Sequence, residues 1–393
     1  MAGGPGDGVA APVDCPVVDF ELSSEQVGLR DAAGRVLDRH ASPDRVRAVV
    51  GPANSRSGPE AFDRQLWDAM AEQGWLALEQ SEDRGGLGLG MVEVSVLCEE
   101  LGRRLAPAPF AGTSLAQCAF RAAADDDTLS PETRDGAAAW LDRLVTGEAV
   151  GCLAWSPTPG GTTTVAGDDT CLLTARPEPT VYASVADVAA VVSADAVYEV
   201  RLAPGEGPSP EPAMDRTRPL AWLRLEQTPA RRIGGVAAAR RMVDRAATAL
   251  AAEMLGASGR VLDMSVEYAK DRIQFGKPIG SFQAIKHRLA DALVDVEGMR
   301  SSVYYAAWCI AAGEPGASLA ASAAKAWCSD ASRRVMASGL QVHGGIGFTW
   351  EHDLHLFVKR SQLDQSSWGD AVFHRERIAT LLSDRKGEYA DLF

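Results

Sequence analysis

The sequence lacks several features that mark whole classes of protein. Its seven cysteines are scattered without a C-x-x-C pair, which argues against a disulfide framework or a zinc site. No uninterrupted run of about 18 apolar residues occurs, so we expect no membrane span. The N-terminus has no basic region ahead of an apolar block and does not resemble a secretory signal. We therefore expect a cytoplasmic protein in a reducing compartment.

Basic residues are also outnumbered by acidic residues. The chain has 39 Lys and Arg residues against 53 Asp and Glu, a net charge of −14. Binding to nucleic acid needs a basic face, so we expect no nucleic-acid partner. The Gly-rich run 85–90 follows no predicted strand and precedes no Lys, so the P-loop and dinucleotide fingerprints are both absent. We predict a tight loop there, before a helix over Met91–Leu101.

Metal-ligand spacing is missing as well. Among the six histidines, only His352 and His355, beside Asp353, lie close enough together to be considered. Both flank an apolar run, so we interpret them as structural polar contacts and expect no metal.

Periodicity and composition divide the remaining chain. Residues 1–18 are Gly/Pro/Ala-rich and predict a disordered leader. Helical periodicity predicts an all-α domain over 19–146, starting at a cap on Ser23 or Ser24. From 147 to 232, short alternating runs rich in Val and Thr predict a small β-domain. Residues 233–393 are helical again and predict a four-helix bundle. The fold class is therefore α+β, with helical domains before and after a small central β-domain.

The elements expected within these domains follow from the same patterns. In the first domain we predict helices over 62–70, 111–124 and 133–146. In the β-domain the strand signals cover 162–165, 171–175 and 189–192, and the Pro-rich segment 204–219 is a loop or edge meander. The four helices of the bundle cover 235–270, 282–312, 316–339 and 367–386.

A sharp corner joins the first two helices of the bundle. Arg272, Gln274 and Phe275 bring a guanidinium, an amide and an aromatic ring to a place where Gly276 and Pro278 break the helix. Such a corner suits an anionic, partly aromatic cofactor, although an ordinary helix–helix loop can have the same composition.

Two stretches together resemble the acyl-CoA dehydrogenase family. Arg272–Ile279 followed by Phe282-Gln283 is similar to its RxxFGxPI…FQ signature, and Gln341–Phe348 is similar to its Q…GG segment at family-like spacing. The helix–β–helix order extends the resemblance over nearly the whole chain. The resemblance implies FAD held across a dimer interface.

The resemblance also implies roles for these residues. Arg272 would meet the pyrophosphate of FAD, and Gln274 and Phe275 would line its adenosine or ribityl part. The neighbouring subunit would bring its backbone close to the ADP moiety through Gln341, Gly344 and Gly345. In the β-domain, Ser156 would replace the hydroxyl of a flavin-binding Thr, and Trp155 would cover a ring or a substrate.

The reaction of the family needs a base that takes an α-proton from the thioester while the flavin accepts the β-hydride. Many members carry a Glu before a Gly-Thr near the last helix, but here Trp368 stands at that place and cannot accept a proton. A second family pattern puts the Glu on the helix before the corner, where Glu253 matches it. Glu253 has no cation partner on its own helix, and Gly256 and Ala257 would leave room for a thioester.

Other acidic residues are weaker candidates for the base. Asp263 and Glu267 lie further along the same predicted helix. Asp370 follows Gly369, and we expect it to cap the last helix.

Three functions remain open at this point. The first is FAD-dependent α,β-dehydrogenation of an acyl-CoA, with Glu253 as base and an electron-transfer flavoprotein or similar acceptor. Residues 347–356 resemble an actinobacterial-type branch, some of whose members act on steroid or other bulky acyl-CoA thioesters, so the enzyme would be a homotetramer or an α2β2 heterotetramer with a paralogue. The second is a non-catalytic subunit that completes the FAD site of the other chain. The third is a fold recruited for non-redox chemistry or carrier-protein substrates.

Overall fold

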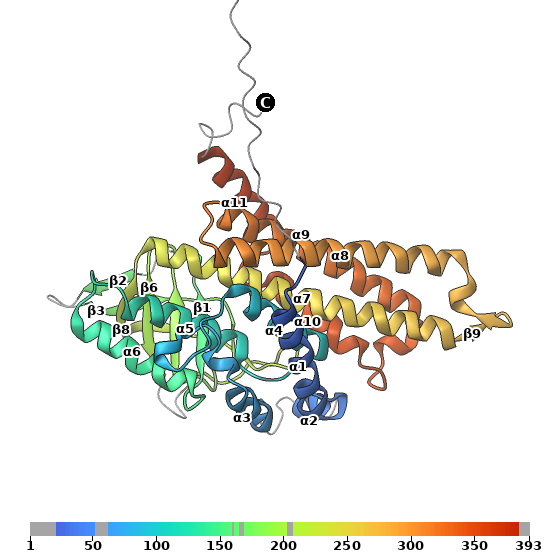
Figure 1. The fold of residues 1–393 in the computed structure, drawn as a ribbon, viewed down its shortest axis with the longest axis horizontal. Coiled ribbons are helices and arrows are strands. Elements are labelled where there is room, and N and C mark those ends of the chain that lie inside the picture. The colour runs from blue at the N-terminus through green and yellow to red at the C-terminus, as the bar shows by residue number, and fades with distance from the viewer. Residues whose placement is uncertain (1–20, 52–61, 159–160, 165–168, 203–206, 385–393) are drawn as a thin grey trace, which may run out of the picture.

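The computed structural model describes residues 21–51, 62–158, 161–164, 169–202 and 207–384, so the predicted leader lies outside the described residues. Figure 1 shows a sheet towards one end of an elongated molecule and long helices that run to the other end. Helices precede the sheet in the chain, and longer helices follow it. This order confirms the predicted fold class, while the exact domain boundaries stay predictions.

The part of the chain before the sheet contains helices and no strand among its described residues. Its helices are α1 (Ser24–His40), α2 (Pro43–Val50), α3 (Arg64–Glu72), α4 (Met91–Arg104), α5 (Phe110–Ala124) and α6 (Pro131–Val145). Of the two serines predicted as possible caps, Ser23 caps α1, through a capping box with Gln26. The expected helix at 62–70 begins later, because the Asp63 side chain accepts from the Leu66 N–H and caps α3. We did not predict α2, which Pro43 opens.

Six strands form the main sheet, in the order β1-β5-β6-β8-β3-β2. They are β1 (Gly151–Trp155), β2 (Gly161–Thr164), β3 (Thr170–Ala175), β5 (Val188–Val192), β6 (Val197–Arg201) and β8 (Leu225–Gly234). The strand signals in the sequence correspond to β2, β3 and β5, whereas β1, β6 and β8 were missed. Two short strands, β4 (Thr180–Val181) and β7 (Leu220–Ala221), pair with each other.

The helices after the sheet are built around α7 (Val236–Asp271), which is about 54 Å long at 1.5 Å per residue. Around it lie α8 (Gln283–Ala311), α9 (Ala317–His343), α10 (Leu354–Ser366) and α11 (Ala371–Asp384). The sequence analysis did not anticipate α10. Just before α10, His352 Nδ1 accepts from the Leu354 N–H at 3.1 Å, and within α10 the His355 ring lies against Trp350. No helix in the described part of the chain is both long and apolar enough to cross a membrane.

Two glycines set how closely α4 and α7 approach. A Cβ atom on Gly256 would lie 1.8 Å from the Glu99 carbonyl oxygen, and one on Gly102 would lie 2.1 Å from that of Glu253. Only glycine fits such a backbone contact. The expectation that Gly256 leaves room for a thioester is therefore wrong, because the backbone of α4 fills that space.

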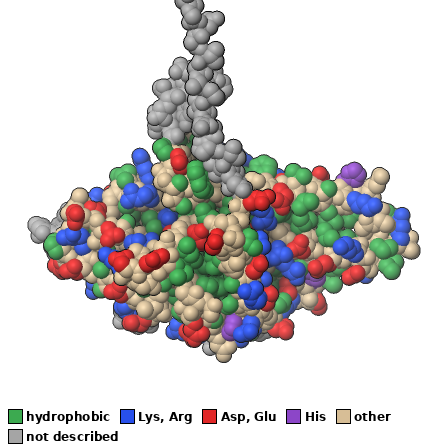
Figure 2. All heavy atoms as spheres, in the orientation of Figure 1, with side chains coloured by type: hydrophobic (Ala, Val, Ile, Leu, Met, Phe, Trp, Pro, Cys, Tyr) green, Lys and Arg blue, Asp and Glu red, His purple; other side chains and the backbone are tan. Residues whose placement is uncertain are grey.

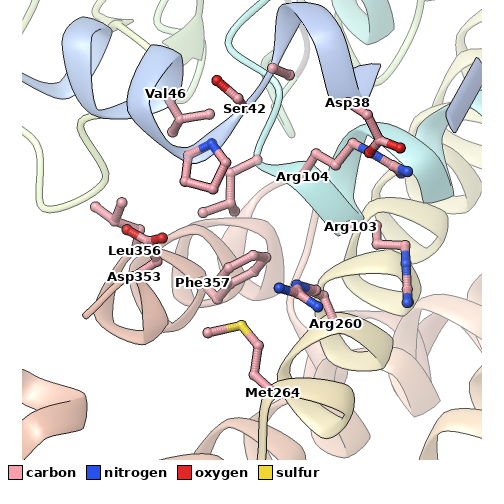
Figure 3. A pocket seen from close by; sticks show the side chains of 13 residues that line it. Asp38, Ser42, Val46, Arg103, Arg104, Arg260, Met264, Asp353, Leu356 and Phe357 are labelled. Carbon is pink, nitrogen blue, oxygen red and sulfur yellow. The ribbon is translucent and has the colours of Figure 1, made fainter. Parts of the chain in front are cut away.

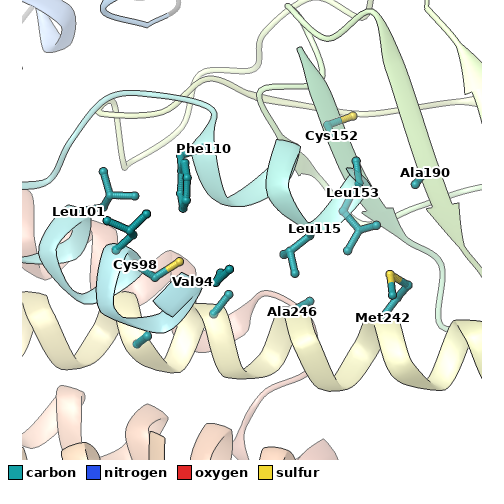
Figure 4. Close-up of a cluster of buried hydrophobic side chains, with 14 of the residues drawn as sticks. Val94, Cys98, Leu101, Phe110, Leu115, Cys152, Leu153, Ala190, Met242 and Ala246 are labelled. Atoms are coloured by element: carbon teal, nitrogen blue, oxygen red, sulfur yellow. The ribbon is translucent and has the colours of Figure 1, made fainter. Parts of the chain in front are cut away.

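The core between α4, α5, β1 and α7 supports the candidate site. Figure 4 shows apolar side chains from all four elements meeting there, among them Val94, Cys98, Phe110, Leu115, Cys152, Leu153, Met242 and Ala246. Leu115, Leu153 and Ala246 belong to this cluster and also line a pocket beside it. The rigid core thus fixes one wall of that pocket.

Candidate active site

The pocket beside the core, here called the Glu253 pocket, lies between α5, the end of β1, the segment 178–182, α7 and the end of α10. Its titratable side chains are Glu178, Tyr182, Arg218, Glu253, Arg360 and Asp364. The open space measures only about 60 Å³, whereas pockets for drug-sized ligands typically hold about 300–1,000 Å³. The pocket is therefore formed but nearly filled by its own side chains.

Glu253 is buried in this pocket and is already ion-paired. Its Oε2 atom lies 2.8 Å from Nη1 of Arg218, on the loop before β7, and 3.6 Å from Nη1 of Arg360, on α10. The prediction that Glu253 lacks a cation partner on its own helix holds, but two other elements supply the partners. Neither arginine was identified from the sequence.

Two further carboxylates complete this buried network. Arg218 donates to Asp364, and Arg360 Nε donates to Asp215 Oδ2 at 3.0 Å. The pKa of Asp364 is raised to about 6, because burial, helped by the nearby Glu253 charge, outweighs the lowering effect of Arg218. Burial also works to raise the pKa of Asp215, but Arg360 and Arg218 outweigh it and hold that pKa below its ordinary value. Three carboxyl groups thus face two guanidinium groups in this buried network.

Two tryptophans close the pocket. The rings of Trp155, at the end of β1, and Trp368, before α11, are stacked with centroids 5.6 Å apart and planes 12° from parallel. We call them the Trp pair. Trp368 has φ of 58° and Tyr182, across the pocket, has φ of 62°, a region that non-glycine residues rarely adopt. Such strain is concentrated at functional sites, and here two instances line one pocket.

Two buried side chains bind the backbone of the turn that carries Trp368. Lys325 Nζ donates to the carbonyl oxygen of Gly369 at 2.9 Å, and His374 Nε2 lies 2.9 Å from that of Trp368. Burial lowers the pKa of Lys325 to about 8 and that of His374 to about 3. Asp370 caps α11 as expected, because its Oδ1 accepts from the Phe373 N–H at 2.9 Å.

Glu178 links the two members of the Trp pair, and sequence reasoning missed it. Its backbone N–H donates to the Trp155 carbonyl oxygen at 2.8 Å. Burial raises the pKa of its carboxyl group, while a hydrogen bond with the Trp368 backbone works against that rise. Beside it, the Tyr182 hydroxyl is buried without a hydrogen-bond partner in the described chain, so this polar group of the pocket is not satisfied.

The corner predicted at 272–282 is a small hairpin, here called the hairpin corner, at the far end of α7 (Figure 1). Strands β9 (Ile273–Gln274) and β10 (Lys277–Pro278) pair across Phe275 and Gly276, whose φ angles are 53° and 77°. Two positive φ angles in a two-residue loop are typical of a type I′ turn. Phe275 is 92% exposed, and its ring lies edge-on to that of Phe282.

The polar side chains of the hairpin corner differ in whether they form hydrogen bonds or ion pairs within the described chain. The Gln274 amide donates to the Ile273 carbonyl oxygen at 2.8 Å. The Arg272 side chain is exposed and finds no hydrogen bond or ion pair among the described residues. Figure 2 shows Lys and Arg side chains among hydrophobic ones at this end of the molecule.

The second predicted cofactor segment lies at the C-terminal end of α9. Gln341 is exposed, and a Cβ atom on Gly344 or Gly345 would meet nothing within 4 Å. The stacked rings of Tyr268 and His343, with centroids 4.6 Å apart, hold this end of α9 against the last turns of α7. The structure thus brings Gln341 and both glycines to the same end of α7 as the hairpin corner.

Ser156 is not part of that end. It is buried where β1 finishes, and its hydroxyl lies 3.4 Å from that of Thr158. It therefore adjoins the Trp pair, since Trp155 precedes it.

The residues near the end of α7 fit an anionic dinucleotide. Arg272 offers an unpaired guanidinium, Phe275 an exposed aromatic face, and the two glycines an unobstructed backbone. They would hold the pyrophosphate and adenosine parts of FAD. When bound, FAD supplies the acceptor for the hydride removed from the acyl group.

Comparison with known proteins agrees with this fold and site. The family description "Acyl-CoA dehydrogenase, N-terminal domain" matches residues 23–128, and "Acyl-CoA dehydrogenase, C-terminal domain" matches residues 234–382. The acyl-CoA dehydrogenase IpdE2 of Mycobacterium tuberculosis is 36% identical over 339 residues, which cover 86% of this chain and 91% of IpdE2.

Solved structures are similar over most of the chain. The ChsE4-ChsE5 complex from Mycobacterium tuberculosis matches with a TM-score of 0.82 and 27% identity, over 93% of this chain and 99% of the matched chain. A variant of the Tcur3481-Tcur3483 steroid ACAD matches with a TM-score of 0.80 and 28% identity, over 92% and 99%. Taken with the hairpin corner and the Glu253 pocket, these matches mean that the chain belongs to the acyl-CoA dehydrogenase family of FAD-dependent oxidoreductases.

Proposed function

We propose that this chain is one subunit of a heteromeric acyl-CoA dehydrogenase for bulky, steroid-like acyl-CoA thioesters. In this proposal it completes the FAD site of a partner chain and does not carry out dehydrogenation in its own Glu253 pocket. The observation that carries the proposal is the Trp pair, because Trp368 stands where many family members have the base and stacks on Trp155 inside the pocket.

The state of Glu253 supports the same conclusion. A general base has to reach the proton that it removes. Ion pairs hold the Glu253 carboxylate in place, because its Oε2 is engaged by Arg218 and approached by Arg360. The remaining space of about 60 Å³ does not admit a bulky acyl group unless the Trp pair moves.

The open end of α7 supports the role towards a partner. Arg272 would bond two pyrophosphate oxygens of a shared FAD, and Gly344 and Gly345 would let the cofactor approach the backbone. Of the two similar solved structures, one is the ChsE4-ChsE5 complex and the other is a Tcur3481-Tcur3483 steroid ACAD. This likeness is the basis for proposing unlike subunits and a bulky substrate.

A second candidate is a homotetrameric dehydrogenase in which Glu253 is the base. It is favoured by the burial of Glu253 in the pocket that also holds Trp155 and Trp368. In that case substrate binding has to displace Trp368 and release Glu253 from Arg218. An electron-transfer flavoprotein or a similar acceptor would reoxidise the flavin in either case.

The decisive experiment compares the chain purified alone with the chain co-expressed with a paralogue encoded beside it. We expect the isolated chain to retain no FAD, and the pair to co-purify with FAD and to reduce it with a steroid-like acyl-CoA. A yellow isolated chain whose flavin is bleached by acyl-CoA would instead establish the homomeric candidate.

Variants of this chain within the co-purified pair separate the two roles. Arg272→Ala should lower the FAD content of the complex, whereas Arg333→Ala, at an exposed site on α9, should not. Glu253→Gln should leave flavin bleaching intact if the reaction occurs in the partner chain. Loss of bleaching with normal FAD content and assembly would identify Glu253 as the base.

A further inference from the structure

A second, larger pocket lies outside the Glu253 pocket, between the α1–α2 turn, the end of α4, α7 and α10. Its open volume is about 360 Å³, within the range of about 300–1,000 Å³ typical of small-molecule sites. Buried apolar side chains form its floor, namely Val46, Leu105, Leu356 and Phe357. Figure 3 shows Arg103, Arg104 and Arg260 around this floor. We call it the Arg260 pocket.

Two of the three arginines already have carboxylate partners. Arg104 Nε donates to Asp38 Oδ1 at 2.7 Å, and Arg103 is paired with Asp263. Asp353, at the rim, is paired in the same way with Arg47, at 2.6 Å.

Arg260 is the exception. Among the described residues its guanidinium has no hydrogen bond and no ion pair, although it is partly buried. Figure 3 shows this guanidinium beside the Phe357 ring, at the edge of the apolar floor. A partly desolvated cation without a counter-charge is unfavourable, so a ligand that brings one anionic group would relieve it.

We propose that the Arg260 pocket binds a small apolar molecule that carries a single carboxylate. Its apolar body would cover Val46, Leu356 and Phe357, and its carboxylate would accept two parallel hydrogen bonds from the planar guanidinium of Arg260. One uncommitted guanidinium matches one monovalent carboxylate. A phosphate monoester carries more charge than a single free cation neutralises, because Arg103 and Arg104 are engaged by Asp263, Asp38 and Glu100.

This site is separate from the Glu253 pocket, and the proposal does not depend on the proposed function. Arg260 follows Glu253 by seven residues on α7, which is about 10 Å along the helix. Leu105 lines the Arg260 pocket, whereas Leu101 and Ala106 line the Glu253 pocket. The end of α4 therefore forms a wall between them.

Calorimetric titration of the full chain with three probes that each contain eight carbon atoms tests the proposal. The probes are octanoate, octanol and octyl phosphate. Octanoate should bind with one site per chain, and octanol should bind at least tenfold more weakly because it lacks the charge. Arg260→Gln should weaken octanoate binding about tenfold to a hundredfold. Arg333→Gln, on exposed α9, is the matched control and should leave binding unchanged.

The other outcomes would overturn the proposal. Equal octanoate affinity for the wild type and Arg260→Gln would place the ligand elsewhere, for example in the Glu253 pocket. Tighter binding of octyl phosphate than of octanoate would assign the site to a phosphate. If octanoate does not bind, the pocket has no carboxylate role.

Arg260→Gln breaks no contact within the described chain, so we expect it to fold, and an unchanged unfolding midpoint would verify this. As a second variant, Met264→Trp fills the pocket and should also abolish octanoate binding.

Discussion

In the middle of α7, Glu253 has an arginine nitrogen 2.8 Å away, whereas at the end of the same helix Arg272 has no partner among the described residues. The Glu253 pocket satisfies its charges internally and fills its volume with the Trp pair. The hairpin corner instead exposes an aromatic ring, a guanidinium and glycine backbone. This difference teaches that the closed region is complete within one chain, while the open region needs a ligand or a second chain. Each prediction below tests one side of this contrast.

The largest effect is expected from Gly256→Ala, in the closed region. The added Cβ would overlap the Glu99 carbonyl oxygen at 1.8 Å, so α4 and α7 must separate. We expect a loss of at least about 3 kcal/mol in the free energy of unfolding, measured by urea denaturation.

Gly28→Ala is the matched control for this change. Gly28 lies in α1, and a Cβ there meets nothing within 4 Å. It should gain up to about 1 kcal/mol from helix propensity. If Gly256→Ala were equally harmless, the backbone contact between α4 and α7 would be disproved.

The second prediction concerns how the free energy of unfolding depends on pH through Lys325, which binds the turn that carries Trp368. Burial lowers the pKa of Lys325 from its ordinary 10.5 to about 8. Between these pH values the unfolded chain binds more protons at this site than the folded protein, so the free energy of unfolding rises with pH. Relative to Lys325→Met, the wild type should gain up to about 3 kcal/mol across this window.

Denaturation of both proteins at pH values below, inside and above the window measures this difference. All other groups titrate in both proteins and cancel in the comparison. Parallel curves for the wild type and the variant would mean that Lys325 keeps its ordinary proton affinity and that the turn is open to water.

A smaller loss is expected from Glu253→Gln. The neutral amide cannot replace the negative charge of Glu253 that pairs with Arg218 and Arg360. Because a charge-assisted hydrogen bond is lost, we expect the free energy of unfolding to fall by about 2 kcal/mol near neutral pH. Removal of the Glu253 charge should also lower the pKa of Asp364, since that charge helps to raise it.

Denaturation measures the stability change, and the carboxyl resonance of Asp364 reports its titration. Glu267→Gln, exposed on the same helix, should change stability by less than about 0.5 kcal/mol. An equally small effect at Glu253 would show that its ion pairs contribute nothing to the fold.

The smallest effect on stability is expected from Gly345→Ala, in the open region. Nothing lies within 4 Å of the added Cβ, so the free energy of unfolding should stay within about 0.5 kcal/mol of the wild type. The FAD content of the assembled enzyme should nevertheless fall, because the added Cβ would keep FAD from coming close to the backbone at position 345. Unchanged FAD content, measured by flavin absorbance, would remove Gly345 from the cofactor site.

The sequence was most informative where local chemistry decides the structure. The helix cap at Ser23 or Ser24, the helix break at Pro278 and the cap at Asp370 each depend on a few neighbouring residues, and all three were predicted correctly. The resemblance of the hairpin corner and the Gln341 segment pointed to the family that the comparisons show.

The sequence was least informative where distant segments meet. Arg218 comes from a loop before β7 and Arg360 from α10, and nothing in the spacing of either residue indicates that both reach Glu253. The role of Gly256 was misread because the apolar face of a helix does not reveal how closely its neighbour approaches. Strand β1 was missed because a strand buried on both faces does not alternate.

The contact between α4 and α7 also limits how substrate range can change in this fold. Glycine at both crossing positions sets the separation of these helices, so moving α4 away from α7 to enlarge the pocket would break this contact. Diversification towards larger acyl groups would therefore have to proceed through side chains that line the Glu253 pocket itself, such as Leu101, Leu115 and Leu250. A combinatorial library for altered specificity would be best confined to those positions.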